Sequence, residues 1–178
     1  ISYRLVGSEM CIRDSSHPVR MTSTNLEAIN LRDLPFDRFG TAIFPVDDMT
    51  PHSDKDAKLC FDDPNLRYYV MRLRSRPAVL TGMTRHRRAT QCLGSADGQP
   101  WWLAVAAPDV EPSQLNRSTV QLVKVQQGEA LQLHQNTWHA GPFFLTKSAL
   151  FFNLELTDTN LTDHNFHRIE ASMKLIMH

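Results

Sequence analysis

The sequence predicts a mainly β protein, built as a sandwich or a barrel, and three observations lead to this prediction. Apolar and polar residues alternate with a period of two in several short runs. Residues that favour turns, namely Gly, Pro, Asn and Asp, separate these runs. No internal repeat or low-complexity tract interrupts the pattern. Several short strands with this punctuation are typical of sandwiches and barrels.

The sequence pattern of the first part of the chain predicts both strand and helix. Residues 25–39 predict a short strand followed by a short helix, and residues 41–46 predict a strand. Residues 47–56 are polar and include Pro51, so they predict a loop. The segment 62–65, Asp-Asp-Pro-Asn, predicts a turn because these residue types favour turn conformations.

Alternating strands dominate the rest of the chain. The predicted strands lie at residues 68–73, 79–86, 101–107, 120–125, 130–134 and 150–156. The alternation changes phase between Leu122 and Val123. Such a change predicts a β-bulge, in which one strand carries an extra residue.

The composition excludes several functional classes. The chain has 178 residues, which predicts one domain. The 19 Lys and Arg balance the 19 Asp and Glu, so the basic excess that nucleic-acid or anionic-membrane binding needs is missing. No apolar run approaches the roughly 18 residues of a membrane span. The cysteines Cys11, Cys60 and Cys92 are too few for a disulfide framework, so we expect a reducing, intracellular and cytoplasmic compartment.

The N-terminal residues differ in character from the rest. Residues 1–15 lack an initiator Met and show no regular period, and they resemble the peptide encoded by translated sequencing-adapter DNA. We therefore expect residues 1–20 to be a non-native or disordered leader and residues 21–178 to form the single domain.

Two polar segments interrupt the apolar β pattern. The first contains His86 and Gln91, and the second runs from Gly128 to His139 and includes His134. If the strands that carry them meet, these imidazoles and the amide share one pocket. Imidazoles ligate transition metals and also transfer protons near neutral pH. The pocket is therefore predicted to hold a metal, an acid–base pair or both.

Neighbouring residues add to this pocket. Alternation places Gly82, Thr84 and His86 on one strand face, where Gly82 leaves room beside the other two. Trp138, next to His139, is either a core aromatic or a platform for the substrate. The basic run at residues 85–88, led by Arg85, is either a solvated face or the source of a guanidinium that clamps a substrate carboxylate.

Two groups of polar residues near the C-terminus have open interpretations. Asn153 and Glu155 share one strand face, opposite to their apolar neighbours. They are exposed if those neighbours form the core, and they face inward if the barrel has a polar lumen. Asp163 either orients the imidazole of His164 as an acid–base unit or only caps a turn.

The two segments resemble the two cupin motifs. The second motif has Gly, Pro, Gly and His at fixed spacing, and its positions are held here by Gly128, His134, Asn136 and His139. The first motif reads His, one residue, His, four residues, Glu, and its positions are held by Thr84, His86 and Gln91. The spacing is kept, while several residue types differ.

This variant is similar to the ureidoglycolate lyase (ureidoglycolate hydrolase) family of cupins, and to its plant-like branch. In that family the first motif typically has Glu-Arg-His followed by Gln, and the second has His ahead of Trp-His. The matching residues here are Arg85, His86, Thr90, Gln91, His134, Trp138 and His139. The resemblance extends over about residues 36–167.

The resemblance implies a cupin-type β-barrel, or jelly roll, with short N-terminal α/β elements, and often a homodimer. It implies cleavage of ureidoglycolate to glyoxylate and urea in allantoin catabolism, with a divalent cation that is often nickel. We expect His86, His134 and His139 to be catalytic. The substrate-binding candidates are Arg85, Gln91, Trp138, Asn153 and Glu155, and the candidate metal ligands are His86, Gln91 and His139.

One position departs from the family pattern in a way that affects chemistry. Thr84 stands where the family has Glu, and a threonine hydroxyl is neither a good ligand nor a good base at neutral pH. Two other functions therefore stay open. The barrel either binds a small carboxylate without catalysis, or it is a different metal-dependent cupin enzyme such as an isomerase or dioxygenase.

Overall fold

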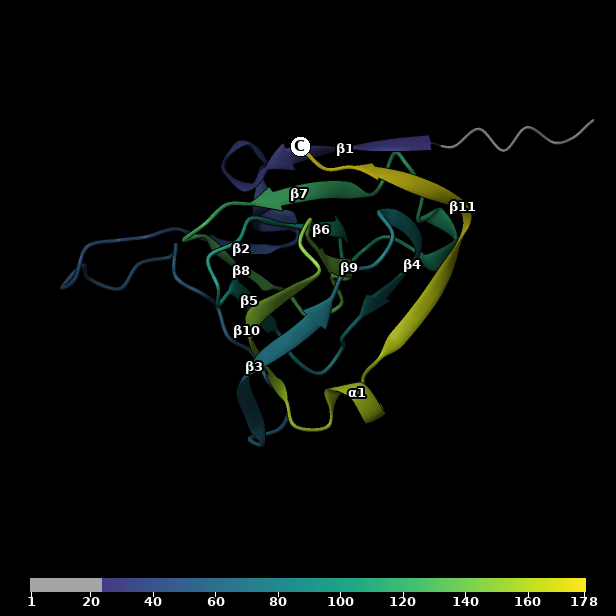
Figure 1. Ribbon diagram of the computed structural model, residues 1–178. Coiled ribbons are helices and arrows are strands. Elements are labelled where there is room, and N and C mark those ends of the chain that lie inside the picture. The colour runs from purple at the N-terminus through teal and green to yellow at the C-terminus, as the bar shows by residue number, and fades with distance from the viewer. Residues whose placement is uncertain (1–23) are drawn as a thin grey trace, which may run out of the picture.

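The protein is described by a computed structural model for residues 24–178, and its strands form two layers (Figure 1). The first layer is a closed barrel, and its strands in order are β1 (Thr24–Asn30), β11 (Asn165–Ile176), β4 (Val79–Arg85), β9 (Trp138–Phe143), β6 (Trp101–Ala106) and β7 (Gln121–Val125). The second is a sheet of β2 (Gly40–Ile43), β8 (Ala130–Leu133), β5 (Gln91–Ser95), β10 (Ser148–Leu156) and β3 (Leu66–Arg74). The mainly β fold expected from the sequence is confirmed.

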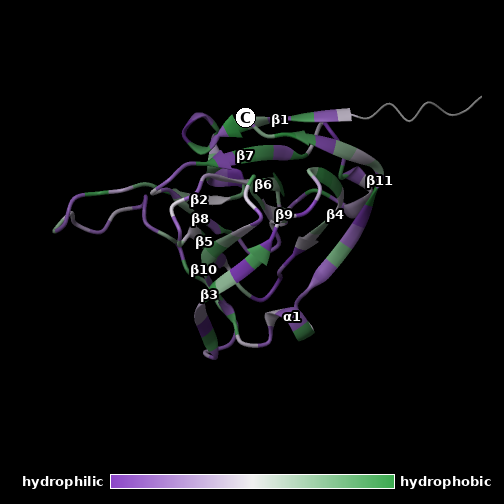
Figure 2. Ribbon diagram, in the orientation of Figure 1, coloured by the Kyte–Doolittle hydropathy of each residue, from purple (hydrophilic) through white to green (hydrophobic). Residues whose placement is uncertain are grey.

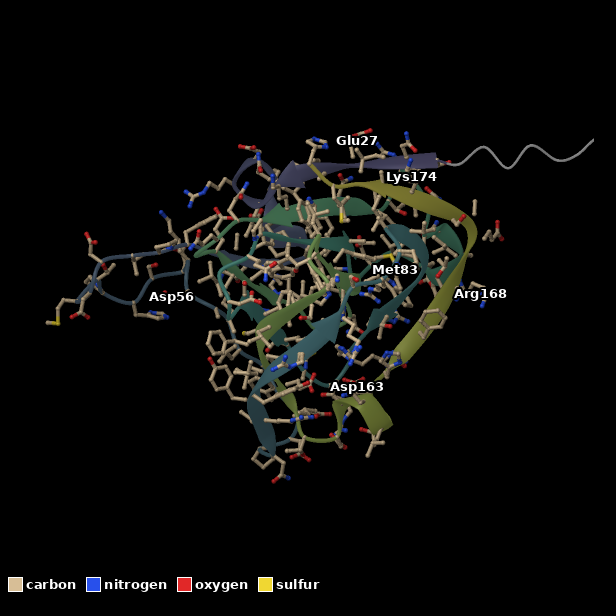
Figure 3. The ribbon with its side chains drawn as sticks, in the orientation of Figure 1. Glu27, Asp56, Met83, Asp163, Arg168 and Lys174 are labelled. Carbon is tan, nitrogen blue, oxygen red and sulfur yellow. The ribbon has the colours of Figure 1, made fainter. Side chains whose placement is uncertain are left out.

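Two hydrophobic cores fill this architecture. The barrel core lies inside the closed barrel and takes side chains from all six of its strands, including Leu26 on β1 and Met83 on β4. Figure 3 labels Met83. The inter-sheet core lies between the barrel and the second sheet, where Leu103 on β6 packs with Phe151 on β10. Because β6 separates the two cores, each of its residues is buried.

The same arrangement corrects the predicted bulge. Leu122 belongs to the barrel core and Val123 to the inter-sheet core, and both are fully buried. Across Gln121–Val125, all of which the structure describes, β7 pairs with β6 without a register shift. The change of phase in the sequence therefore reflects a strand that is apolar on both faces, and the bulge prediction was wrong.

The N-terminal elements differ slightly from the prediction. β1 pairs in parallel with β11 and β7 and so closes the barrel. The predicted short helix is replaced by two 3₁₀ turns, Leu31–Asp33 and Phe36–Arg38. Pro35 lies between them and has no N–H to continue a hydrogen-bonded helix. The predicted leader, residues 1–20, lies outside the described residues, and the domain boundary stays a prediction.

The remaining elements are short. A third 3₁₀ turn covers Pro112–Gln114, and α1 covers Thr159–Thr162. From α1 the chain enters β11, which runs along one side of the molecule up to β1 (Figure 1). Hydrophilic and hydrophobic residues are mixed along β11 (Figure 2), in keeping with a strand that has one exposed face. No helix in residues 24–178 is long and apolar enough to cross a membrane.

Candidate functional site

A cavity of about 250 Å³ lies beside the inter-sheet core, and Leu93, Met71 and Leu73 contribute to both. We call it the histidine cavity. Its polar lining consists of Tyr69, Arg76, Thr84, His86, Gln91, His139, Asn153, Glu155, Asn160 and His164. Cavities for drug-sized ligands usually measure about 300–1,000 Å³, so this cavity suits a small metabolite.

Two strands of the barrel bring His86 and His139 together. β4 pairs with β9 through Thr84 and His139, and His86 follows the end of β4. The two imidazole rings lie 5.0 Å apart between centroids, and both residues are buried. The structure therefore confirms that the two distant sequence segments meet at one cavity.

Backbone carbonyls set the tautomer of both rings. His86 Nδ1 lies 2.7 Å from the carbonyl oxygen of Asp163, and His139 Nδ1 lies 3.1 Å from that of Thr137. A carbonyl only accepts hydrogen bonds, so each Nδ1 carries the hydrogen and donates it. In a neutral ring, the lone pair then resides on Nε2. Both imidazoles are thus arranged to accept a proton or to bind a cation through Nε2.

His139 is held in its neutral form. Burial, together with a smaller effect of the neighbouring His86, lowers the pKa of His139 to about 3, and the hydrogen bond to Thr137 only partly opposes this shift. An imidazole with such a pKa carries no charge near neutral pH. It therefore acts as a ligand or a hydrogen-bond acceptor, not as a proton donor.

This neutral histidine predicts a pH-dependent stability. In the unfolded chain His139 has its ordinary pKa of 6.5, so below that pH the unfolded chain binds one proton more than the folded protein. The free energy of unfolding of the metal-free protein should therefore fall as the pH decreases from 7 to 5, by up to about 1.4 kcal/mol per pH unit from this residue. Urea denaturation in EDTA at several pH values measures the slope. The variant His139→Gln should show a shallower slope, and an unchanged slope contradicts the prediction.

An amide and carboxylate cluster forms the cavity floor. Gln91 Nε2 donates to Asn153 Oδ1 at 3.2 Å and to Glu155 Oε2 at 3.3 Å. Asn153 Nδ2 donates to Glu155 at 2.9 Å, and Tyr69 donates its hydroxyl to Glu155 at 3.1 Å. Burial raises the pKa of Tyr69, so the phenol stays protonated and remains a donor. Asn153 and Glu155 are therefore buried in a polar lumen, which is the second of the two interpretations above.

Gln91 also offers an acceptor to whatever occupies the cavity. Its Nε2 must face the Glu155 carboxylate, because a carboxylate accepts hydrogen bonds. The other atom, Oε1, is buried and has no hydrogen-bond partner among the described residues. A buried acceptor without a partner is unfavourable, so a ligand with an N–H, an O–H or a positive charge would stabilise it.

Asp163 fixes the loop that carries His86. Its carboxylate accepts hydrogen bonds from the backbone N–H groups of Arg87 and Arg88 at 2.8 and 2.9 Å, while its carbonyl oxygen accepts from His86. Figure 3 shows Asp163 next to α1. The residue thus caps a turn and orients His86. His164 is held apart from this carboxylate, with its Nε2 3.4 Å from the hydroxyl of Thr84.

His134 does not reach the histidine cavity. It follows the end of β8, its backbone N–H donates to Phe39, and its Nε2 lies 3.1 Å from the carbonyl oxygen of Asp37. The ring lines a different cavity of about 560 Å³, which the two N-terminal 3₁₀ turns also line. The expectation that His134 shares a pocket with His86 and His139 is therefore wrong. The reason is that the turn after β8 pairs with the N-terminal segment.

Arg85 and Trp138 also lie elsewhere. The guanidinium carbon of Arg85 lies 4.3 Å from the centre of the Trp138 ring, and the indole N–H donates to the carbonyl oxygen of Val110. Trp138 is buried in the barrel core. Because side chains alternate along a strand, the inward positions of His86 and His139 turn their neighbours Arg85 and Trp138 to the opposite face. Neither lines the histidine cavity.

Several cavity residues were missed or misread from the sequence, among them Arg76, His164 and Gly82. Arg76 lines the cavity from the connection between β3 and β4, where no alternating pattern marks it. His164 appeared only as a partner for Asp163. The space beside Gly82 is occupied, since a Cβ there would lie 2.3 Å from the Phe166 ring. Gly82 is thus required for the close approach of Phe166 on β11.

The cavity residues fit a divalent cation through neutral donors. His86 and His139 each donate Nδ1–H to a carbonyl oxygen, the arrangement that orients imidazole ligands toward metals. Gln91 adds a buried amide oxygen without a partner. Within residues 24–178, no group of three or more His, Cys, Asp and Glu side chains could hold a metal ion. The donor set of two imidazoles and one amide therefore carries no negative charge.

The two segments that resemble cupin motifs meet at one cavity beside a closed β-barrel. This arrangement defines a cupin-type protein. The family model described as Ureidoglycolate lyase matches residues 47–174. The chain therefore belongs to the ureidoglycolate lyase family.

The other comparisons add little. Among solved structures, RmlC from Streptococcus suis in complex with dTDP-D-xylose is 12% identical, with a TM-score of 0.37, over 51% of this chain and 43% of that chain. The chain thus matches less than half the length of that protein. The comparison with curated proteins finds no match.

Proposed function

We propose that the histidine cavity binds ureidoglycolate and cleaves it to glyoxylate and urea, as a step of purine breakdown through allantoin. The observation that carries this proposal is the meeting of His86 and His139, each with its Nε2 lone pair free for a ligand, in a small cavity. The floor of that cavity supplies the acceptors that a ureido group needs, from Gln91 and Glu155. The family membership supports the same reaction.

The reaction moves one proton within the substrate. The hydroxyl group loses its proton, the C–O bond becomes a double bond, the C–N bond breaks, and the departing nitrogen gains a proton. Glyoxylate and urea form without a water molecule. His86 accepts the hydroxyl proton on Nε2, and the solvent-exposed His164 donates a proton to the nitrogen, a role expected at first for His134.

The other cavity residues hold the substrate in place. His139, which stays neutral, accepts a hydrogen bond from the substrate hydroxyl. Gln91 Oε1 and the Glu155 carboxylate accept hydrogen bonds from the ureido N–H groups. These contacts place the leaving urea at the buried end of the cavity.

A divalent cation fits the same cavity. His86, His139 and Gln91 would hold it in place of the proton-accepting and substrate-binding roles given above, and when bound it would stabilise negative charge on the substrate oxygen. His164 is outside this donor set and keeps its role in proton transfer. Nickel, implied by the family resemblance, accepts imidazole ligands well.

Restoring the family's acidic residue should strengthen metal binding. Thr84 pairs with His139 across β4 and β9 and lines the cavity, so Thr84→Glu adds a charged oxygen ligand beside the imidazoles. We expect this variant to bind Ni²⁺ about tenfold or more tightly than Thr84→Gln, which has nearly the same size and no charge. Isothermal titration with NiCl₂ measures both affinities. Equal affinities of the two variants contradict this donor set.

The activity itself has a direct test. Purified wild-type protein, with and without added Ni²⁺, is incubated with ureidoglycolate, and glyoxylate and urea are measured. Equal amounts of both products support the lyase reaction. Release of ammonia in place of urea, or binding without any product, contradicts it, and the second result identifies the non-catalytic carboxylate binder.

Two further expectations stay predictions. A homodimer would need an apolar surface to cover, and the outer face of β3 and β10 exposes Tyr68, Val70 and Phe152. The rings of Tyr68 and Phe152 stack on this face, 5.9 Å apart between centroids. The intracellular compartment expected from the cysteine content is likewise a prediction.

A further inference from the structure

The histidine cavity has opposite electrical character at its two ends. Its buried floor holds the carboxylate of Glu155, whose residue is 4% exposed. Its mouth holds Arg76, an exposed residue on the connection between β3 and β4. Among the described residues that line the cavity, Arg76 is the only Lys or Arg.

Arg76 is positioned but not neutralised. Its guanidinium carbon lies 4.4 Å from the centre of the Phe143 ring, and Nη2 donates a long hydrogen bond of 3.5 Å to the carbonyl oxygen of Pro142. No acidic side chain in residues 24–178 lies within ion-pair distance of it. Packing against β9 lowers its pKa through burial, although an arginine keeps its charge. The guanidinium therefore retains hydrogen-bond donors for an anion.

The other nearby arginines are already committed. The guanidinium carbon of Arg67 lies 3.5 Å from the centre of the Tyr69 ring, and its Nη1 lies 4.0 Å from Oε1 of Glu155. Arg85 stacks on Trp138, outside the cavity. Arg88 pairs with Asp62, Asp63 and Asp158. Arg76 is therefore the cation that remains for a ligand in this cavity.

We infer that Arg76 is the residue that recognises the substrate carboxylate and thereby sets the direction in which the substrate binds. This inference rests on the proposed function, since it names the carboxylate of ureidoglycolate as the group that Arg76 binds. A guanidinium pairs with a carboxylate through two parallel hydrogen bonds. At the floor, Glu155 repels a second carboxylate and attracts N–H groups. The acid end of a ureido acid thus lies at the mouth, and its ureido end lies at the floor.

This role predicts a preference for carboxylates that depends on one residue. Ureidoacetate is ureidoglycolate without the reacting hydroxyl, so it binds without being cleaved, and ureidoacetamide is its neutral counterpart. We expect the wild-type protein to bind ureidoacetate about 30-fold or more tightly than ureidoacetamide in isothermal titration. In Arg76→Met the affinity for ureidoacetate should fall by a similar factor, while the affinity for ureidoacetamide changes less than about threefold.

Two further variants separate recognition from folding. Arg76→Lys keeps the charge without the planar fork and should retain part of the preference. Arg74→Met removes an exposed arginine two residues away, outside the cavity, and should leave the preference unchanged. Three results would overturn the inference. In the first, Arg76→Met lowers the affinities for ureidoacetate and ureidoacetamide equally. In the second, Arg76→Met still prefers ureidoacetate as strongly as the wild type does, and in the third the wild type binds neither ligand. Because these measurements need no turnover, the preference can be present even if no glyoxylate is released, and then only the proposed reaction fails.

Discussion

Replacing His86 with Ala is expected to lower kcat/KM for ureidoglycolate by about 10²–10⁴-fold, because it removes the general base, and replacing His139 with Ala is expected to lower it by a smaller factor, because it removes a hydrogen-bond acceptor. Each ring contributes an Nε2 lone pair to the histidine cavity, and Ala removes both this acceptor and the ring that fills the space. Release of glyoxylate by the purified variants measures the loss. Thermal denaturation of each variant establishes that the protein is folded under the assay conditions.

His134→Ala is the matched control for this experiment. The sequence motif treats His134 like the other two histidines, but its ring binds the carbonyl oxygen of Asp37 and lines a different cavity. We therefore expect kcat/KM to change by less than about threefold, since general acid–base catalysis needs hydrogen-bond reach to the substrate. A loss at His134 as large as that at His86 would mean that the reaction occurs elsewhere, and the proposed site would be rejected.

Replacing Asp163 with Ala should have the largest effect on stability. Asp163 is 2% exposed as a residue, and its carboxylate accepts hydrogen bonds from the backbone N–H groups of Arg87 and Arg88. Ala leaves these donors without partners inside the protein, where water does not replace the carboxylate. We expect the free energy of unfolding to fall by about 3 kcal/mol, measured by urea denaturation at pH 7.

Asp158→Ala is the control for this second prediction. Asp158 also accepts hydrogen bonds from Arg88 and Thr162, but it lies at the surface. Water compensates for the loss of an exposed ion pair, so we expect a much smaller change in stability. Equal losses for the two variants would show that the buried position of Asp163 has no special importance.

The strand pattern was readable because alternation is a local property. Along β3 and β10, more exposed and more buried residues alternate, and this period of two is visible in the sequence. β7 misled the interpretation because both of its faces are buried, which removes the alternation. β11 was missed, since Glu170, Lys174 and Leu175 are residue types that favour helices more than strands.

The site was partly readable for the same reason. His86 and His139 lie in segments with recognisable spacing, and the pairing of β4 with β9 brings them to one cavity. Arg76 could not be recognised in this way, because it lies in the connection between β3 and β4, which has no periodic pattern and no motif spacing. The sequence assigned its role to Arg85, which alternation along β4 turns toward Trp138.

The order of residues alone determined the β class, the two polar segments and the similarity to ureidoglycolate lyases, since each depends on short-range spacing or residue identity. Only the tertiary structure decided that His134 leaves the site and that Arg76 and His164 enter it. It also showed that Asn153 and Glu155 point inward. These facts depend on which strands pair and which face of each strand is covered, and that choice is made by contacts between residues far apart in the chain.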